Sequence, residues 1–276
     1  MKKIALLIGV WGLASCGTTA GVQEFTTYAK AFDSVVEASD AVLNELASEE
    51  RTTRLRSIDR GSVSSKFDRK DITVFAPSAD PPFVASIRFA VQSVADLNGI
   101  LLAYAQGRPL DVLKGDVAAL QASALGFEKV DATDAASKAL KGEIAILKEA
   151  LDVLAGIGSR EAFRTELIRT ADGINAVLDV VLNNTQVAFT TLTASEFRAL
   201  RGVGANTAGI NEDIATEREM LAEWLHLIEL SQVALAKAVK AAGAPGGRNE
   251  RLIEAAVLSG DLQARVERIK RLSAAN

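Results

Sequence analysis

The feature that most constrains the fold of this chain is a recurring spacing of apolar residues, three and four positions apart. It is clearest between residues 22 and 56, where the stripe consists of Phe25, Tyr28, Phe32, Val35, Ser39, Val42 and Leu46. This spacing places the side chains on one face of a helix, as in the a and d positions of a heptad. A helix with such a stripe buries it against other helices. The chain is therefore expected to consist of long helices packed side by side.

The same periodicity recurs in further segments, which are separated by turns that contain glycine or proline. Their approximate ranges are 82–106, 110–124, 131–154, 160–200, 210–242 and 249–273, with Gly126 expected to stop the second and with candidate breaks near 183–184 and 193–194 in the fourth. Short turns between long helices favour antiparallel neighbours. The sequence predicts an all-α fold, an elongated antiparallel bundle of about six or seven helices, several of them long, in one domain over residues 22–276.

Residues 59–82 interrupt the helical pattern. A glycine, several serines and three prolines exclude a continuous helix here. Within this segment, Val63–Phe67 and Ile72–Phe75 alternate in part and predict a small hairpin, with a disordered loop as the alternative. Long loops inside a compact domain are uncommon and often functional. The segment is therefore the first candidate for contact with a partner.

The chain begins with an apolar segment that differs from the later helices. Lys2 and Lys3 precede the apolar run Ile4–Leu13, and small residues follow it up to Cys16. A charged start, an apolar centre and a small-residue end are the three parts of a secretory signal peptide. The run has about ten residues, whereas a helix that spans a bilayer needs roughly twenty. A transmembrane anchor is the weaker interpretation, and residues 1–15 are expected to be a signal peptide.

Leu13-Ala14-Ser15-Cys16 resembles the lipobox of bacterial lipoproteins, in which a leucine and two small residues precede the lipidated cysteine. The resemblance implies that Cys16 is the lipidation site and mature N-terminus, followed by a tether over residues 16–21. Several acyl chains together anchor a protein stably in a membrane. In this family an aspartate after the cysteine favours the inner membrane, so Gly17 favours the outer membrane. The alternative is an ordinary signal peptide with a chance cysteine.

The composition excludes several classes of partner and site. The formal net charge is −4, and loss of the signal peptide removes two lysines and leaves the domain more acidic. Surfaces that bind nucleic acid are usually basic, so no nucleic-acid partner is expected. Cys16 is the only cysteine, which excludes an internal disulfide, a cysteine-based zinc site and haem attachment through two cysteines.

One spacing typical of metal sites occurs near the C-terminus. Glu223 and His226 form a Glu-x-x-His pattern, which in ferritin-like di-iron bundles directs a carboxylate and an imidazole toward one metal. Such a site needs two of these patterns, and His226 is the only histidine. Glu219 shares the helix face, so a single weak metal site is the alternative. The favoured interpretation is a polar stripe toward solvent or a partner, with no metal or cofactor predicted.

No local pattern indicates a catalytic centre. The sequence has no Gly-x-Ser-x-Gly elbow and no phosphate-binding Gly-x-x-x-x-Gly-Lys loop. Acidic pairs such as Glu49-Glu50 and Glu212-Asp213 are interpreted as charges near helix ends, where they suit the helix dipole. Catalytic carboxylates can be far apart in sequence, so these patterns do not decide against an enzyme. No catalytic or cofactor-binding residue is predicted.

Basic residues concentrate in two places. The first set lies around the irregular segment and consists of Arg51, Arg54, Arg56, Arg60, Lys66, Arg69 and Lys70, interleaved with aspartates. It is either a patch for anionic lipid, lipopolysaccharide or an acidic partner, or, as favoured, a solvated surface of mixed charge. The second set is Arg265, Arg268, Lys270 and Arg271, which suits the negative end of a helix dipole.

The predicted function is a lipid-anchored, non-enzymatic scaffold or binding partner in the bacterial envelope, in the outer membrane and facing the periplasm. Its expected partners are the membrane, through Cys16, and an envelope protein. Self-association through the stripe of Val22–Arg56 is an alternative to its burial inside the bundle. Two other functions stay open: membrane insertion in the manner of α-helical toxins, with Ile174–Leu182 as the best hairpin candidate, and an envelope enzyme that uses carboxylates.

Overall fold

The computed structural model describes residues 21–60, 72–128, 138, 140–142, 148–149, 151–152, 162–202, 206–243 and 248–274. Cys16, the signal peptide, the tether up to residue 20, the first predicted hairpin strand and most of the helix predicted at 131–154 lie outside these residues. The part described contains helices and turns and no strand, which confirms the all-α prediction.

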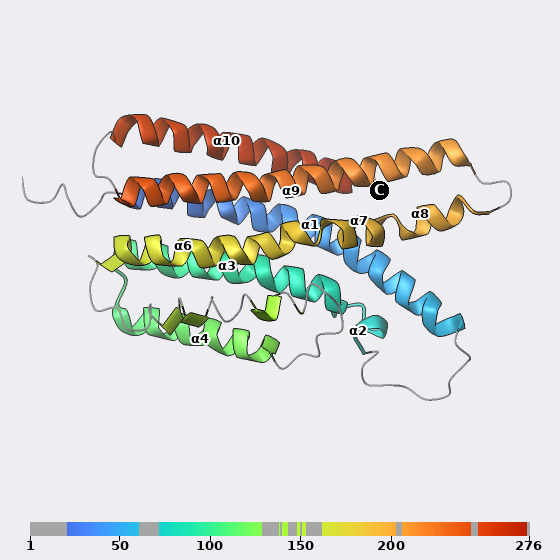
Figure 1. Cartoon of the computed structure of the whole chain (residues 1–276), viewed down its shortest axis with the longest axis horizontal. Coiled ribbons are helices and arrows are strands. Elements are labelled where there is room, and N and C mark those ends of the chain that lie inside the picture. The colour runs from blue at the N-terminus through green and yellow to red at the C-terminus, as the bar shows by residue number, and fades with distance from the viewer. Residues whose placement is uncertain are drawn as a thin grey trace, which may run out of the picture.

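The helices are α1 (Val22–Arg60), α2 (Ile72–Phe75), α3 (Pro82–Gln106), α4 (Leu110–Glu128), α6 (Ala162–Asn183), α7 (Thr185–Leu192), α8 (Ala194–Ala199), α9 (Thr207–Gly243) and α10 (Arg248–Ser273). Helices α1, α3, α6 and α9 form a closed ring in which each helix contacts the next. Neighbours in the ring run in opposite directions along an elongated molecule (Figure 1). Helix α10 packs against α1 and α9, and α4 packs on the outside of α3. The predicted elongated antiparallel bundle is therefore confirmed.

The stripe of α1 supplies the centre of the core. Phe25, Phe32, Val35, Val42 and Leu46 are completely buried, against the partners of α1 in the ring and against α10. This burial removes apolar surface from water, the main favourable contribution to folding. The apolar stripe of α1 is thus buried inside the molecule.

The one polar position in that stripe has a partner within the core. Ser39 is buried, donates its hydroxyl hydrogen to the carbonyl of Val35 at 2.7 Å and accepts the indole N–H of Trp224 at 2.9 Å. A buried indole N–H without an acceptor would be costly. The hydrogen bond therefore joins α1 to α9 and explains a serine at an apolar position.

The residue before α1, Gly21, lies against the C-terminal end of α9. Gly21 has φ 83°, and a Cβ atom there would lie 2.7 Å from Cα of Ala242. The left-handed backbone and the close approach both require glycine. The start of α1 is therefore held at the end of the bundle where α9 finishes, which we call the proximal end.

The predicted breaks after α6 are confirmed. Asn184 and Thr193 each bond a carbonyl four residues earlier through the side chain, from Nδ2 to Val180 and from Oγ1 to Phe189, both at 2.7 Å. Their backbone torsions leave the helical region, as expected where side chains compete for helix carbonyls. These breaks divide the segment into α6, α7 and α8.

Two local predictions were wrong. Ile72–Phe75 is a single helical turn with Val74 buried, and not a strand. Its amide–carbonyl bond from Ala76 to Ile72, at 2.8 Å, is local, whereas a strand needs a paired neighbour. Gly126 does not stop α4, which continues to Glu128, because one glycine in a helix costs only about 1 kcal/mol.

Within the part of the chain that the structure describes, no helix has the length and apolar character needed to cross a membrane.

Candidate functional site

The end of the bundle opposite Gly21 collects several short elements. It consists of the C-terminal part of α1, α2, the start of α3, α7, α8 and the N-terminal part of α9 (Figure 1). We call it the distal end. The short helices α2, α7 and α8 meet the ends of the long helices there, so side chains from several elements come together. The distal end contains a cleft and a group of acidic residues.

An open cleft of about 450 Å³ lies between α1, the start of α3, α7 and α8. We call it the distal cleft; its walls are Glu50, Thr53, Arg54, Phe83, Val187, Thr190, Thr191, Ala194 and Arg198. The volume falls within the range of sites that hold small molecules. Apolar side chains, hydroxyl groups and two guanidinium groups share the lining.

Arg198 connects α8 to α1 across this cleft. Its Nη2 donates to Oγ1 of Thr53 at 2.9 Å. Its Nη1 is buried and has no acceptor among the described residues. Next to it, Ser195 donates to Oε2 of Glu49 at 2.5 Å. The guanidinium is thus held in place on one side and left with an unused donor on the other.

Glu50 binds the start of α3 to α1. Its carboxylate accepts the amides of Phe83 at 3.4 Å and Val84 at 3.3 Å, and Nε of Arg54 at 3.1 Å. Burial raises the pKa of Glu50, and the charge of Arg54 and both amide bonds oppose that shift. A carboxylate at a helix N-terminus satisfies amides without an intrahelical partner. The contact fixes Phe83 in the wall of the cleft.

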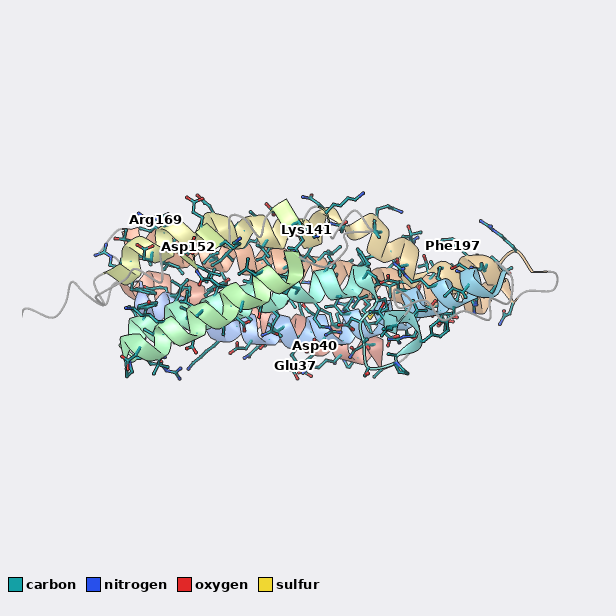
Figure 2. The ribbon with its side chains drawn as sticks, turned by 90° about the horizontal axis from the view of Figure 1, so that it is seen from below. Glu37, Asp40, Lys141, Asp152, Arg169 and Phe197 are labelled. Atoms are coloured by element: carbon teal, nitrogen blue, oxygen red, sulfur yellow. The ribbon has the colours of Figure 1, made fainter. Side chains whose placement is uncertain are left out.

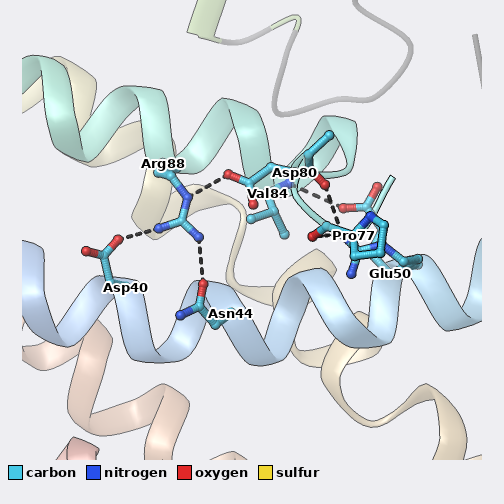
Figure 3. A network of polar contacts seen from close by, with 9 residues as sticks. Asp40, Asn44, Glu50, Pro77, Asp80, Val84 and Arg88 are labelled. Atoms are coloured by element: carbon cyan, nitrogen blue, oxygen red, sulfur yellow. Dashed lines mark hydrogen bonds and ion pairs between the residues drawn. The ribbon is translucent and has the colours of Figure 1, made fainter. Parts of the chain in front are cut away.

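The segment before α3 is held to α1 by two arginines (Figure 3). Arg88 bonds Asp80 at 2.6 Å, Asn44 at 3.1 Å and also Asp40. Arg51 donates from Nη2 to the carbonyls of Pro77 at 3.3 Å and Ala79 at 2.9 Å. This part of the segment predicted as an irregular loop is thus attached to the bundle.

Arg51→Met is expected to loosen this attachment. Two backbone carbonyls lose their donor, and each hydrogen bond to a charged group is worth about 1.5–3 kcal/mol. The hydrogen-bonded amides of Ala76 and Ala79 should then exchange their hydrogens about tenfold faster or more, as measured by mass spectrometry. The matched control is Arg56→Met at an exposed position of α1; equal exchange in both variants would contradict the assignment.

Five carboxylates from three helices surround the junction of α1, α8 and α9. Glu217 of α9 is only 9% exposed, and its neighbours are Glu45, Glu49, Glu196 and Asp213. Burial and these negative charges raise the pKa of Glu217 to about 8. Its Oε2 has no donor among the residues described. At neutral pH the folded protein therefore keeps a proton on Glu217.

Sequence reasoning missed Glu217 as a functional candidate. The residue occupies a position of the apolar stripe of α9, between Ile214 and Leu221, and both neighbours are buried. An acid at an apolar position is the signal that identifies it, because carboxylates are rarely buried unless paired.

The Glu-x-x-His candidate is used for helix packing. Glu223 accepts from Arg265 at 2.5 Å, Glu219 accepts from Arg268 at 2.6 Å, and His226 lies 3.2 Å from Glu229. In the described part of the chain no three potential ligands are placed to hold a metal. Glu219 and Glu223 therefore face α10 of the same molecule, whereas His226 is exposed and pairs with a residue of its own helix.

The C-terminal cations have a role beyond the helix dipole. Arg265 and Arg268 pair with α9, and Lys270 pairs with Glu37 of α1 at 2.8 Å. These contacts place α10 over the groove between α1 and α9. Sequence periodicity does not predict these ion pairs, because the partners are far apart in the chain.

The basic set around residues 51–70 is divided by the structure. Arg51 and Arg54 bind groups of the same molecule, and Arg56 is exposed. Lys66, Arg69 and Lys70 lie outside the described residues. The part that the structure describes thus contributes more to internal attachment than to a basic patch.

No protein-family model, curated protein or solved structure matches this chain. The residues of this chain are therefore the basis for its proposed function.

Proposed function

We propose that this protein is a lipid-anchored, non-enzymatic binding protein or scaffold of the bacterial cell envelope, attached to the outer membrane through Cys16 and facing the periplasm. The observation that carries the proposal is the course of α1, which starts directly after the tether and ends at the distal end (Figure 1). A helix of 39 residues is about 58 Å long at 1.5 Å per residue. The start of α1, which follows the proposed tether in the sequence, and the distal end are thus at opposite ends of the bundle.

The distal end has features that suit a protein partner. Its exposed apolar side chains are Ile72 and Phe75 of α2, Val187 of α7 and Phe197 of α8. Phe197 lies toward one tip of the molecule (Figure 2). Exposed apolar surface is available to a protein partner. Two of them belong to the irregular segment that the sequence singled out for partner contact.

A carboxylate enzyme is the second candidate, and Glu217 is the observation in its favour. A pKa raised to about 8 is typical of catalytic acids as well as of buried structural groups. Glu217 lines neither the distal cleft nor the cleft between α3 and α4. A substrate in either cleft would not meet it, so binding is the better supported function.

Membrane insertion is supported less well by the packing of α6. Ile174 and Leu178, from the candidate hairpin segment, are completely buried in the core. Asp179 on the same segment accepts a hydrogen bond from Gln232 of α9 at 2.8 Å. Release of the segment would expose core residues of the ring and cost their burial free energy.

Cys16→Ser tests the anchor. The native chain is expected in the membrane fraction, and the variant in the soluble fraction, because it lacks the thiol that lipid attachment needs. Crosslinking in cells followed by purification should recover an envelope protein with the native chain and less of it with the variant. Equal membrane association of both chains would contradict the lipid anchor.

Phe197→Asp tests the distal end separately. Phe197 is 43% exposed, so the variant should fold while losing the crosslinked partner. Val233→Asp is the matched control, since Val233 of α9 is 46% exposed. If both variants keep the partner, the distal end is not the binding surface.

A further inference from the structure

We infer that the distal cleft is a binding site for a small organic anion, a molecule with an acidic head group and an apolar body. The inference goes beyond the proposed function, because it concerns a small ligand and does not depend on the lipid anchor or on a protein partner. It stands on the charge of the lining, on an unused buried donor and on the apolar wall.

The lining has an excess of positive charge. Arg54 from α1 and Arg198 from α8 both line the cleft, and Glu50 is its only acidic residue. The Glu50 carboxylate already accepts two backbone amides and Nε of Arg54. The lining therefore carries one net positive charge, although the whole chain has a net charge of −4. This charge favours an anionic head group.

Arg198 has donors for an acidic head group. It makes no ion pair among the described residues, its Nη2 is held by Thr53, and its buried Nη1 lacks an acceptor. A buried donor without an acceptor is unfavourable, and more so when it is charged. Guanidinium groups bind carboxylate and phosphate oxygens especially well. A small rotation that brings Nη1 to such an oxygen would remove this cost.

The hydroxyl groups of the cleft differ in what they can donate. Thr190 and Thr191 already donate to the carbonyls of Gln186 and Val187. Thr53 accepts from Arg198 and keeps its own hydroxyl hydrogen, since each hydroxyl has one donor and two acceptor positions. Thr53 is thus the hydroxyl that can donate to the same head group.

The rest of the wall suits an apolar body. Phe83, Val187 and Ala194 line the cleft beside the threonines. Sites for small molecules are mostly apolar, with a few polar groups that fix orientation. The acidic head group is either a free carboxylate or a phosphate, and both share the chemistry that Arg198 recognises. The two are separated by experiment.

The test uses the full chain carrying Cys16→Ser and calorimetric titration with four probes. Octanoate and octyl phosphate carry the two head groups, 1-octanol lacks the charge, and acetate lacks the apolar body. We expect at least one octyl anion to bind about tenfold or more tightly than 1-octanol and acetate, since a charge-assisted hydrogen bond contributes about 1.5–3 kcal/mol. The tighter anion identifies the head group. Equal binding of all four, or none, overturns the proposal.

Variants locate the site. Arg198→Gln should weaken binding of the octyl anion about tenfold or more, whereas Arg56→Gln, at an exposed position of α1, should leave it unchanged. Ala194→Leu keeps both arginines and fills the cleft, so it should also weaken binding. Circular dichroism identifies a variant that fails to fold. If Arg198→Gln does not fold, binding to Ala194→Leu tests the site instead. Binding that is unchanged in Ala194→Leu overturns the assignment to this cleft.

Discussion

Trp224→Ala is expected to lower the free energy of unfolding by about 3–5 kcal/mol, the range for a large aromatic residue removed from a core. Trp224 of α9 is 1% exposed and is among the largest buried side chains of the molecule. The substitution leaves a cavity at the contact of α1 and α9, which close-packed neighbours fill only in part. Urea unfolding followed by circular dichroism measures the loss.

Two milder variants separate packing from hydrogen bonding at this position. Trp224→Phe keeps most of the apolar volume and removes the donor, so a smaller loss of about 1–2 kcal/mol is expected. Ser39→Ala removes the acceptor and leaves the indole N–H buried and unpaired, at about 1–3 kcal/mol. A loss below about 1 kcal/mol for Trp224→Ala would show that the α1–α9 contact is not the centre of the core.

Glu217→Gln is expected to stabilise the protein at neutral and alkaline pH and to have little effect near pH 4. The pKa of Glu217 is about 8 in the folded state and about 4.3 in an unfolded chain. Between these values the unfolded chain releases a proton that the folded protein keeps, so the stability of the native chain falls as pH rises. Above about pH 8 this loss is complete.

The size of the effect follows from the same shift. One pKa unit corresponds to 1.36 kcal/mol, so the penalty at pH 7 has an upper limit of about 3.7 kcal/mol. Glutamine resembles the protonated acid and removes the penalty. Unfolding in urea at pH 4, 7 and 9 measures the difference, with exposed Glu212→Gln as the control on the same helix. An equal effect of Glu217→Gln at all three pH values would contradict a buried, protonated acid.

The stability gained in Glu217→Gln arises at the distal end. Glu217 meets α1 through Glu45 and Glu49, and α8 through Glu196. Ionisation of Glu217 therefore adds repulsion where α8 joins the bundle. The acid at this position thus costs stability at neutral and higher pH.

Much of the helical framework was predictable because its signals are local. The stripe from Phe25 to Leu46 predicted both the first helix and its buried face. Pro81 and Pro82 predicted the start of α3, and Gly107 its end, where φ is 70°. The breaks at Asn184 and Thr193 were also visible. Each depends on residues within about four positions, the range of one helical turn.

Ile72–Phe75 shows where local signals were insufficient. Four apolar and β-branched residues in a row have strand character. The segment itself contains no residue that excludes a strand. Helix α1 lies beside this segment, buries Val74 and provides Arg51, which binds the carbonyls after it. Those contacts decided in favour of a helical turn.

The sequence alone determined which segments are helical, which faces are apolar and that the chain begins with a segment resembling a lipoprotein signal, because these properties depend on neighbouring residues. The tertiary structure decided which faces meet. It joined Arg265 to Glu223, surrounded Glu217 with acids from three helices, and formed the distal cleft from residues as far apart as Glu50 and Arg198. Ion pairs, shifted pKa values and clefts depend on distances of a few ångströms between remote parts of a chain, and helical periodicity carries no information on those distances.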